Sequence, residues 1–155
     1  IVTAWIAITP STPESGCMRV MPGSHIRGQQ GHSDTYAMEN LLSRGQILDV
    51  EVDEGCAVNI LLHPGEMSLH HVLVVHGSEI NQTQMPRHGY AIRYIPTYCK
   101  QIGGRTTSLL VRGEDPYNNF DTVPRPISDM HPDAVSFREQ SNKAVKSILM
   151  KGARI

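Results

Sequence analysis

The sequence predicts a mostly-β fold, either a sandwich, a jelly roll or a small barrel, with one helix towards the C-terminal end. Short runs of β-branched and apolar residues recur up to residue 111, and turns rich in Gly and Pro separate them. After residue 130 the apolar spacing becomes broadly helical, and Pro132 stands where the first turn of a helix favours proline. Because no internal repeat or linker interrupts the pattern, we expect a single domain over residues 1–155.

The individual elements follow from the same pattern. Residues 47–52 alternate apolar and polar side chains, as a half-buried strand does, whereas the other runs are rich in Val, Ile, Leu or Tyr. A weakly periodic segment over residues 34–44 predicts a short helix that ends at Gly45. The expected strands are residues 1–8, 17–21, 47–52, 56–63, 67–76, 89–98 and 107–111.

Composition and charge argue against several classes of partner. The 155 residues include 14 Lys or Arg and 15 Asp or Glu, so the net charge is close to zero. The sequence shows no basic stripe that would indicate a nucleic acid or an anionic membrane as a partner. No apolar run approaches the roughly 18 residues that span a bilayer. Cys17, Cys56 and Cys99 are far apart and form no CxxC, which is typical of reduced thiols in the cytoplasm. We therefore expect a cytoplasmic protein whose partner is a small molecule.

The most informative segment of the chain is residues 70–78 together with Arg87. An apolar run ends at His76, Ser78 follows two positions later, and Arg87 lies beyond a polar turn. A neutral imidazole suits iron, zinc or copper, and the planar guanidinium of Arg matches a carboxylate with two hydrogen bonds. This spacing on a β-scaffold therefore indicates a metal ligand and an acidic co-substrate in one pocket.

Several motifs stand in one order along nearly the whole chain. Together they resemble the phytanoyl-CoA dioxygenase family, which comprises iron(II)- and 2-oxoglutarate-dependent oxygenases on a double-stranded β-helix, the cupin-like jelly roll. The motifs are TAWIAI at 3–8, ESGCMRVMPGSH at 14–25, PGEMSLHH at 64–71, HGSEIN at 76–81, Arg87 and IRYIP at 92–96.

The resemblance implies roles for four residues and two cofactors, Fe(II) and 2-oxoglutarate. His76 matches the family's distal iron ligand, and Arg87 matches the arginine that holds the far carboxylate of 2-oxoglutarate. Ser78 matches a hydroxyl that assists this arginine, and Trp5 matches a tryptophan that lines the co-substrate pocket. Iron held by two histidines and one carboxylate keeps positions open for 2-oxoglutarate and O₂. The implied reaction is the hydroxylation of a small organic substrate.

One part of the family pattern is absent from this sequence. The first two iron ligands of the family form a His-x-Asp pair upstream of the Thr-Ala-Trp strand, and they are expected before Ile1. The chain also starts without Met, inside a strand-like run. We interpret it as the C-terminal portion of a longer protein, an N-terminally incomplete jelly roll that is inactive by itself. Its open strand edges predict a homo-oligomer that covers them.

Two alternative functions stay open at this point. If the absent carboxylate is replaced by Gly or Ala, a member of the same family becomes a halogenase, because chloride binds the iron there. The second alternative is a non-catalytic β-barrel that binds a small acid or only oligomerises. The residues that separate these alternatives are the ones expected upstream of Ile1.

Other histidines and one arginine compete with the assigned residues. His32-Ser33-Asp34 matches the His-x-Asp pattern of the two expected iron ligands. It lies in a polar segment, however, and is interpreted as a loop or a helix cap. His70 has the same parity as His76, but in a straight strand it lies roughly 20 Å away. His71 faces the other side of that strand, so we expect no three-histidine site there. Arg93 competes with Arg87, and we interpret it as one half of an ion pair inside the barrel.

Overall fold

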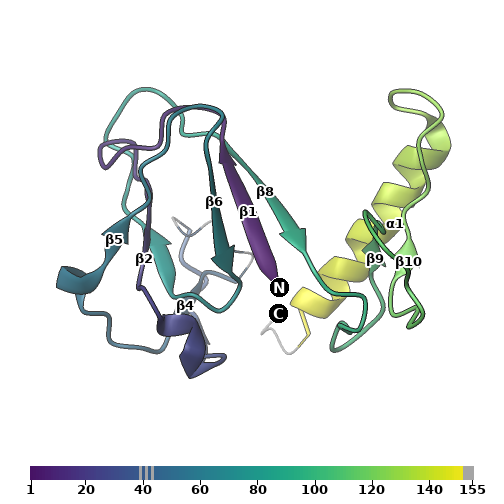
Figure 1. The fold of residues 1–155 in the computed structure, drawn as a ribbon, viewed down its shortest axis with the longest axis horizontal. Helices are drawn as coiled ribbons and strands as arrows, with labels where there is room; N and C mark the ends of the chain where they lie inside the picture. The colour runs from purple at the N-terminus through teal and green to yellow at the C-terminus, as the bar shows by residue number, and fades with distance from the viewer. Residues whose placement is uncertain (39, 41, 43, 152–155) are drawn as a thin grey trace. The chain divides into compact units, whose positions relative to one another are not determined.

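The computed structural model describes residues 1–38, 40, 42 and 44–151. In this part of the chain the fold is mostly β with one C-terminal helix, α1 (Pro132–Leu149), as predicted (Figure 1). The chain forms two compact units. The first comprises residues 1–33 and 47–95, and the second comprises residues 34–46 and 96–155. The single domain over residues 1–155 stays a prediction. No helix within the described ranges is long and apolar enough to cross a membrane.

The first unit contains a three-stranded antiparallel sheet in the order β6-β1-β8 (Figure 1). Its strands are β1 (Val2–Ala7), β6 (Met67–His71) and β8 (Gly89–Tyr94). Thr3 on the central strand lies opposite His70 on one side and Arg93 on the other. Because side chains alternate along a strand, Thr3, His70 and Arg93 share a face with Trp5, two residues further along β1.

A second three-stranded antiparallel sheet in the same unit has the order β5-β2-β7. Its strands are β2 (Met18–Val20), β5 (Val58–Asn59) and β7 (His76–Ser78). The register places Val20 opposite His76 and Met18 opposite Ser78. His76 and Ser78 therefore lie on one face of this sheet, and Gly77 lies on the other.

The expected strand over residues 67–76 is wrong, because a turn divides it into β6 and β7. The N–H of Val74 donates to the carbonyl oxygen of His71 at 3.1 Å, and the N–H of Leu73 donates to Nδ1 of His71 at 3.2 Å. The turn carries the chain from the first sheet to the second. His70 and His76 are therefore not separated along one straight strand, and the expected distance of roughly 20 Å between them is wrong as well.

The expected helix over residues 34–44 is absent from the described positions of that segment, while residues 39, 41 and 43 lie outside the described residues. β3 (His32–Asp34) and β4 (Gln46–Leu48) form a two-stranded sheet instead. Tyr36 has a φ of 55°, and its N–H donates to the carbonyl oxygen of Arg44 at 3.0 Å. This cross-strand pairing replaces the hydrogen bonds that a helix would make four residues apart.

The remaining strands are shorter than expected, for local reasons. Residues 54–56 form the 3₁₀ helix η2 (Glu54–Cys56), whose first turn is capped by the side chain of Asp53. β8 ends before Pro96, which has no N–H to continue a ladder. β9 (Thr107–Ser108) pairs in parallel with β10 (Asp121–Thr122), a pairing that the sequence pattern did not predict.

The buried apolar core is small and lies in the first unit. Among the described residues it comprises Ala4, Ala7, Cys17, Met18 and Val74. On the face of β6-β1-β8 opposite to Trp5, large apolar side chains stay exposed, with Leu69 at 66% and Tyr90 at 61%. The two sheets of this unit therefore carry the site residues on a scaffold held more by backbone ladders than by a large core.

Candidate functional site

Three of the four residues singled out in the sequence meet at one place, between the two sheets of the first unit. The guanidinium carbon of Arg87 lies 5.3 Å from the ring centroid of Trp5 on β1. An Nη2 hydrogen of Arg87 is directed at Oγ of Ser78 on β7, at 3.4 Å. A cation over an aromatic face is attracted by the ring quadrupole, so the indole also orients the guanidinium. A fixed guanidinium with a hydroxyl beside it is suited to binding a carboxylate.

Backbone contacts hold the segment that carries Arg87. Oγ1 of Thr9 accepts a hydrogen bond from the N–H of His88 at 2.8 Å and donates to the carbonyl oxygen of Pro86 at 3.2 Å. The N–H of Ile8 donates to the carbonyl oxygen of His88 at 3.0 Å. These bonds tie both sides of Arg87 to the end of β1, so the position of its guanidinium is set by the same strand that carries Trp5.

Gly89 is a site residue that the sequence reasoning missed. A side chain at position 89 would overlap Cζ2 and Cε2 of the Trp5 indole and would lie 2.8 Å from its Nε1. The indole therefore rests directly on the backbone of β8. The signal in the sequence was a glycine two residues after Arg87, at the start of an otherwise bulky strand.

A hydrogen bond to the backbone fixes the tautomer of the neutral His76 ring. Its Nδ1 lies 2.8 Å from the carbonyl oxygen of Val74, which accepts but cannot donate, so Nδ1 carries the proton of the neutral ring. Nε2 then holds the lone pair, as in a histidine that is oriented for metal binding. The side chain of His76 is exposed.

The Pro-Gly-Ser-His segment, residues 22–25, holds the backbone of the residue that precedes His76. Oγ of Ser24 accepts a hydrogen bond from the N–H of Val75 at 2.8 Å and donates to the carbonyl oxygen of Met21 at 2.7 Å. The N–H of Met21 in turn donates to the carbonyl oxygen of Val75 at 2.9 Å. Ser24 is buried in η1 (Ser24–Arg27), so it positions the residue before His76 and does not reach a ligand.

His70 lies next to His76, contrary to the expectation from the sequence. Their ring centroids are 5.9 Å apart, and the ring planes are inclined by 48°. Nδ1 of His70 lies 3.4 Å from the hydroxyl of Ser68. Partial burial lowers the pKa of His70, and the neighbouring His76 and Arg93 act in the same direction. The imidazole of His70 is therefore favoured in its neutral form.

The His32-Ser33-Asp34 segment is engaged elsewhere. Nδ1 of His32 lies 2.9 Å from the carbonyl oxygen of Gln30, and the carboxylate of Asp34 forms an ion pair with Arg44, with Nε of Arg44 at 2.9 Å. Over the described ranges, no group of three or more His, Cys, Asp or Glu is arranged to hold a metal ion. His76 and the Arg87 cluster therefore fit one ligand of a metal site and a carboxylate clamp, and do not make up a complete metal centre.

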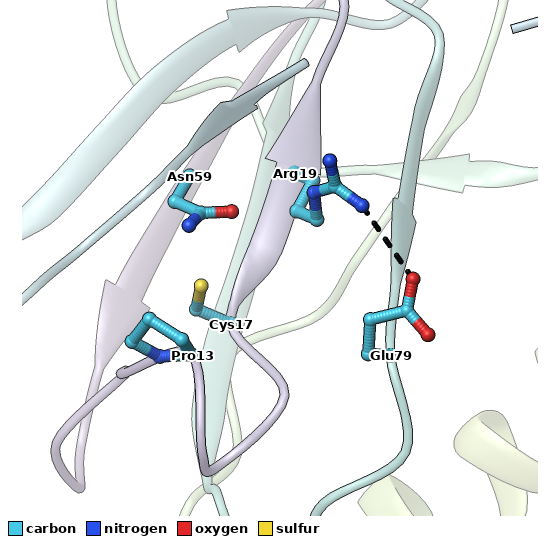
Figure 2. A pocket seen from close by; sticks show the side chains of 5 residues that line it. All are labelled: Pro13, Cys17, Arg19, Asn59 and Glu79. Carbon is cyan, nitrogen blue, oxygen red and sulfur yellow. Dashed lines mark ion pairs between the residues drawn. The ribbon is translucent and has the colours of Figure 1, made fainter. Parts of the chain in front are cut away.

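A separate pocket of about 220 Å³ lies on the face of the sheet β5-β2-β7 opposite to His76 and Ser78. Figure 2 shows the five residues that line it, Pro13, Cys17, Arg19, Asn59 and Glu79. Arg19 forms ion pairs with Glu54 at 2.6 Å and with Glu79 at 3.5 Å, so its charge is already balanced. Burial raises the pKa of the Cys17 thiol, which disfavours the reactive thiolate. This pocket is thus an ion-paired outer surface and not part of the candidate site.

A model of one protein family matches residues 1–89, a span that includes Trp5, His76, Ser78 and Arg87. The family is described as phytanoyl-CoA dioxygenase (PhyH). Among curated proteins, the peroxisomal phytanoyl-CoA dioxygenase of Rattus norvegicus is 32% identical over 111 residues, which cover 70% of this chain and 32% of that protein.

Solved structures agree with the family match. The non-heme monooxygenase ThoJ in its apo form superposes with a TM-score of 0.83 at 32% identity, covering 97% of this chain and 53% of the ThoJ chain. A nickel complex of ThoJ superposes with a TM-score of 0.74 at 29% identity, covering 97% and 51%. The chain thus spans about half of ThoJ and about a third of the rat protein.

Proposed function

Because the chain belongs to the phytanoyl-CoA dioxygenase family, we propose that it forms the co-substrate clamp and the distal-ligand side of a non-haem Fe(II)- and 2-oxoglutarate-dependent oxygenase. The observation that carries this proposal is the cluster of Arg87, Ser78 and Trp5, in which Ser78 lies on β7, the strand that begins at His76. A clamp of this composition fits one carboxylate of a small dicarboxylic acid.

The same proposal covers the fold. We take the sheets β6-β1-β8 and β5-β2-β7 as the two facing sheets of a double-stranded β-helix. Support comes from the chain order, since β1 and β2, β5 and β6, and β7 and β8 are each divided between the two sheets. The superposition on ThoJ over 97% of this chain also supports it. In such a fold the facing sides of the sheets line the pocket, and we assign Trp5, Ser78 and His76 to those sides.

Each residue has a defined part in the proposed site. The Arg87 guanidinium binds the far carboxylate of 2-oxoglutarate with two parallel hydrogen bonds, Ser78 adds a third, and the Trp5 indole excludes water from one side. Nε2 of His76 provides one imidazole ligand to iron(II). When bound, iron(II) with 2-oxoglutarate and O₂ supplies the oxidising chemistry that hydroxylates an unactivated carbon of a small organic substrate.

Binding of 2-oxoglutarate tests the proposal, because Trp5 is the single tryptophan of the chain. We expect a saturable change in Trp5 fluorescence, with the affinity weakened about tenfold or more in Arg87→Ala by loss of charge-assisted hydrogen bonds. Arg93→Ala is the matched control, since Arg93 lies on β8, six residues after Arg87 and opposite Thr3, and makes no ring contact or hydrogen bond to Trp5 or Ser78 in the described structure. Equal affinities in Arg87→Ala and the unmodified chain would contradict the proposal.

A turnover assay, run beside the titration, distinguishes an oxygenase from an acid-binding module. Succinate production from 2-oxoglutarate in the presence of Fe(II) and O₂ supports the oxygenase. Binding through Arg87 without any succinate production by the protein expressed with its full natural sequence favours the non-catalytic alternative.

A further inference from the structure

The C-terminal end of α1 satisfies only some of its carbonyl groups by itself. The last carbonyl oxygens of a helix have no N–H partner further along the helix. The N–H of Met150 donates to the carbonyl oxygen of Lys146 at 2.9 Å, and the N–H of Lys151 donates to that of Ile148 at 3.2 Å. Met150, at the C-cap, has a φ of −89°, so it does not adopt the left-handed conformation that commonly closes a helix. The carbonyl oxygen of Leu149 therefore depends on a partner from another part of the chain.

Arg44 is that partner, from a segment more than a hundred positions earlier in the sequence. Nη1 of Arg44 donates to the carbonyl oxygen of Leu149 at 3.2 Å and to that of Lys151 at 3.4 Å. A cation is also stabilised beside the negative end of a helix dipole. Because the side chain of Arg44 is only 17% exposed, water screens these interactions less than it screens those of a surface arginine.

Asp34 orients the guanidinium of Arg44. Oδ2 of Asp34 accepts a hydrogen bond from Nε of Arg44 at 2.9 Å and another from Nη2. Nε and Nη2 form one edge of the planar guanidinium, so Nη1 remains on the opposite side for the end of α1. The Asp34 carboxylate thus fixes which nitrogen of Arg44 reaches the helix.

A hairpin brings Asp34 and Arg44 together. The N–H of Thr35 donates to the carbonyl oxygen of Gly45 at 3.3 Å, and the N–H of Tyr36 donates to that of Arg44 at 3.0 Å. A side chain at Gly45 would lie 2.8 Å from the backbone nitrogen of Tyr36, so the two arms of the hairpin approach closely. The positions of both charged residues are therefore set by the backbone of the hairpin.

We infer that the contacts of Arg44 with Asp34 and with the end of α1 form a clasp, through which hairpin 34–46 and the last turn of α1 open and close as one cooperative unit. The hairpin belongs to the same compact unit as α1. The clasp gives Asp34 a role other than metal ligation. The inference is independent of the proposed function, because it uses none of the residues assigned to the carboxylate clamp or to iron.

Hydrogen exchange of the 155-residue chain, resolved by mass spectrometry, tests the inference, because amide exchange reports local opening. In Arg44→Met we expect exchange about tenfold faster both in residues 35–46 and in residues 145–151, as befits the loss of charge-assisted hydrogen bonds. Asp34→Asn keeps the size of the side chain and removes its charge, and a smaller acceleration is expected in the same two segments. The double variant is expected to exchange no faster there than Arg44→Met, since both changes act through one contact.

Arg105→Met is the matched control from the same compact unit. Arg105 also has a well-bonded guanidinium, which donates to Oδ1 of Asp121 at 2.6 Å and to the carbonyl oxygens of Asn118 at 2.7 Å and Phe120 at 2.9 Å. These partners lie outside α1. We therefore expect Arg105→Met to accelerate exchange around residues 118–121 and to leave residues 145–151 at the rate of the unmodified chain.

The amides of β1 show whether each variant stays folded, and we expect their exchange to be unchanged. If Arg44→Met accelerates exchange in β1 as well, Asp34→Asn decides the result, since it is the milder change. Unchanged exchange of residues 145–151 in Asp34→Asn and Arg44→Met overturns the inference. Equal acceleration of those residues in Arg105→Met overturns it too, because the effect would then come from any loss of an arginine in this unit.

Discussion

The backbone of Gly89 lies directly against the indole of Trp5, so closely that any side chain at position 89 would overlap the ring. On its π-face, the same indole has the guanidinium of Arg87 at 5.3 Å from the ring centroid. Trp5 therefore contacts two residues that are separated by only one position in the sequence. The position of the clamp depends on the absence of a side chain at residue 89.

Replacing Gly89 with alanine is expected to displace the indole. The overlap with Cζ2 and Cε2 of Trp5 is an overpacking change, for which losses of about 1–3 kcal/mol in the free energy of unfolding are typical. Urea denaturation measures this loss, and a red shift of Trp5 emission reports the displaced ring. We also expect weaker 2-oxoglutarate binding, since Arg87 loses its aromatic support.

Gly77→Ala is the control for this prediction. Gly77 also lies in a strand, β7, but a side chain built there meets nothing within 4 Å. Its unfolding free energy and Trp5 emission are expected to stay close to those of the unmodified chain. Identical emission spectra for Gly89→Ala and Gly77→Ala would contradict the role assigned to Gly89.

The outer surface of the second sheet offers a test of which ion pairs matter. Arg19 binds Glu54 through both the carboxylate at 2.6 Å and the backbone carbonyl oxygen at 3.0 Å, whereas the carboxylate of Glu79 is 3.5 Å away. Both carboxylates are exposed, so the added bond to the backbone is what distinguishes Glu54. Exposed pairs contribute little, so we expect Glu79→Gln to change the unfolding free energy by less than about 0.5 kcal/mol. Arg19→Met also removes the link between β2 and η2, and a loss of about 1–2 kcal/mol is expected. Chemical denaturation of both variants makes the comparison, and equal losses would refute it.

The overall fold class could be predicted from local patterns. Runs of β-branched residues between Gly and Pro turns indicated short strands, and the helix that begins at Pro132 followed from its proline and apolar spacing. These features depend on residues close together in the sequence. The family membership was predicted as well, because it rests on the order of motifs within residues 1–89.

The break between β6 and β7 could not be predicted in the same way. Residues 72–75 are all apolar, a pattern typical of a buried strand, and the turn instead depends on the side chain of His71 and on Ser24. Ser24 lies 51 residues away from Val75, whose N–H it binds. Local residue propensities do not depend on contacts between residues so far apart in the sequence. The proximity of His70 to His76 was missed for the same reason.

Cys56 provides a prediction about pH. Its thiol lies 3.2 Å from a carboxylate oxygen of Asp53, and this hydrogen bond, together with the negative charge, raises the pKa of Cys56. A raised pKa lowers the thiolate fraction at a given pH, and the thiolate is the reactive form. Asp53→Asn keeps an acceptor for the N–H of Gly55 but removes the charge. We expect faster alkylation of Cys56 by iodoacetamide at pH 8 and a midpoint of the rate profile at lower pH.

Mass spectrometry resolves the alkylation rate of Cys56 from those of Cys17 and Cys99. Glu51→Gln is the matched control, because it removes a nearby charge that does not contact the thiol of Cys56 in the described structure. Its alkylation rate is expected to equal that of the unmodified chain. If Asp53→Asn and Glu51→Gln accelerate the reaction equally, the effect is one of overall charge and not of the Asp53 contact.

The turn before β2 packs against the backbone that follows Ser78. Gly16 has a φ of 71°, and a side chain there would overlap the carbonyl oxygen of Glu79 and lie 3.3 Å from the backbone nitrogen of Asn81. Gly16→Ala therefore adds a backbone overlap to the left-handed strain of about 1–2 kcal/mol. Gly23→Ala isolates the strain alone, because Gly23 has a φ of 75° and a side chain there meets nothing within 4 Å.

We expect Gly16→Ala to unfold at lower urea than Gly23→Ala, with a difference in unfolding free energy of about 2 kcal/mol from the forced shift of backbone. Because Glu79 follows Ser78 directly, the shift also moves the hydroxyl of Ser78 away from Arg87, which it contacts at 3.4 Å. The affinity for 2-oxoglutarate, measured by Trp5 fluorescence, should then fall in Gly16→Ala but not in Gly23→Ala. Equal stability and equal affinity in the two variants would show that the turn at Gly16 does not position Ser78.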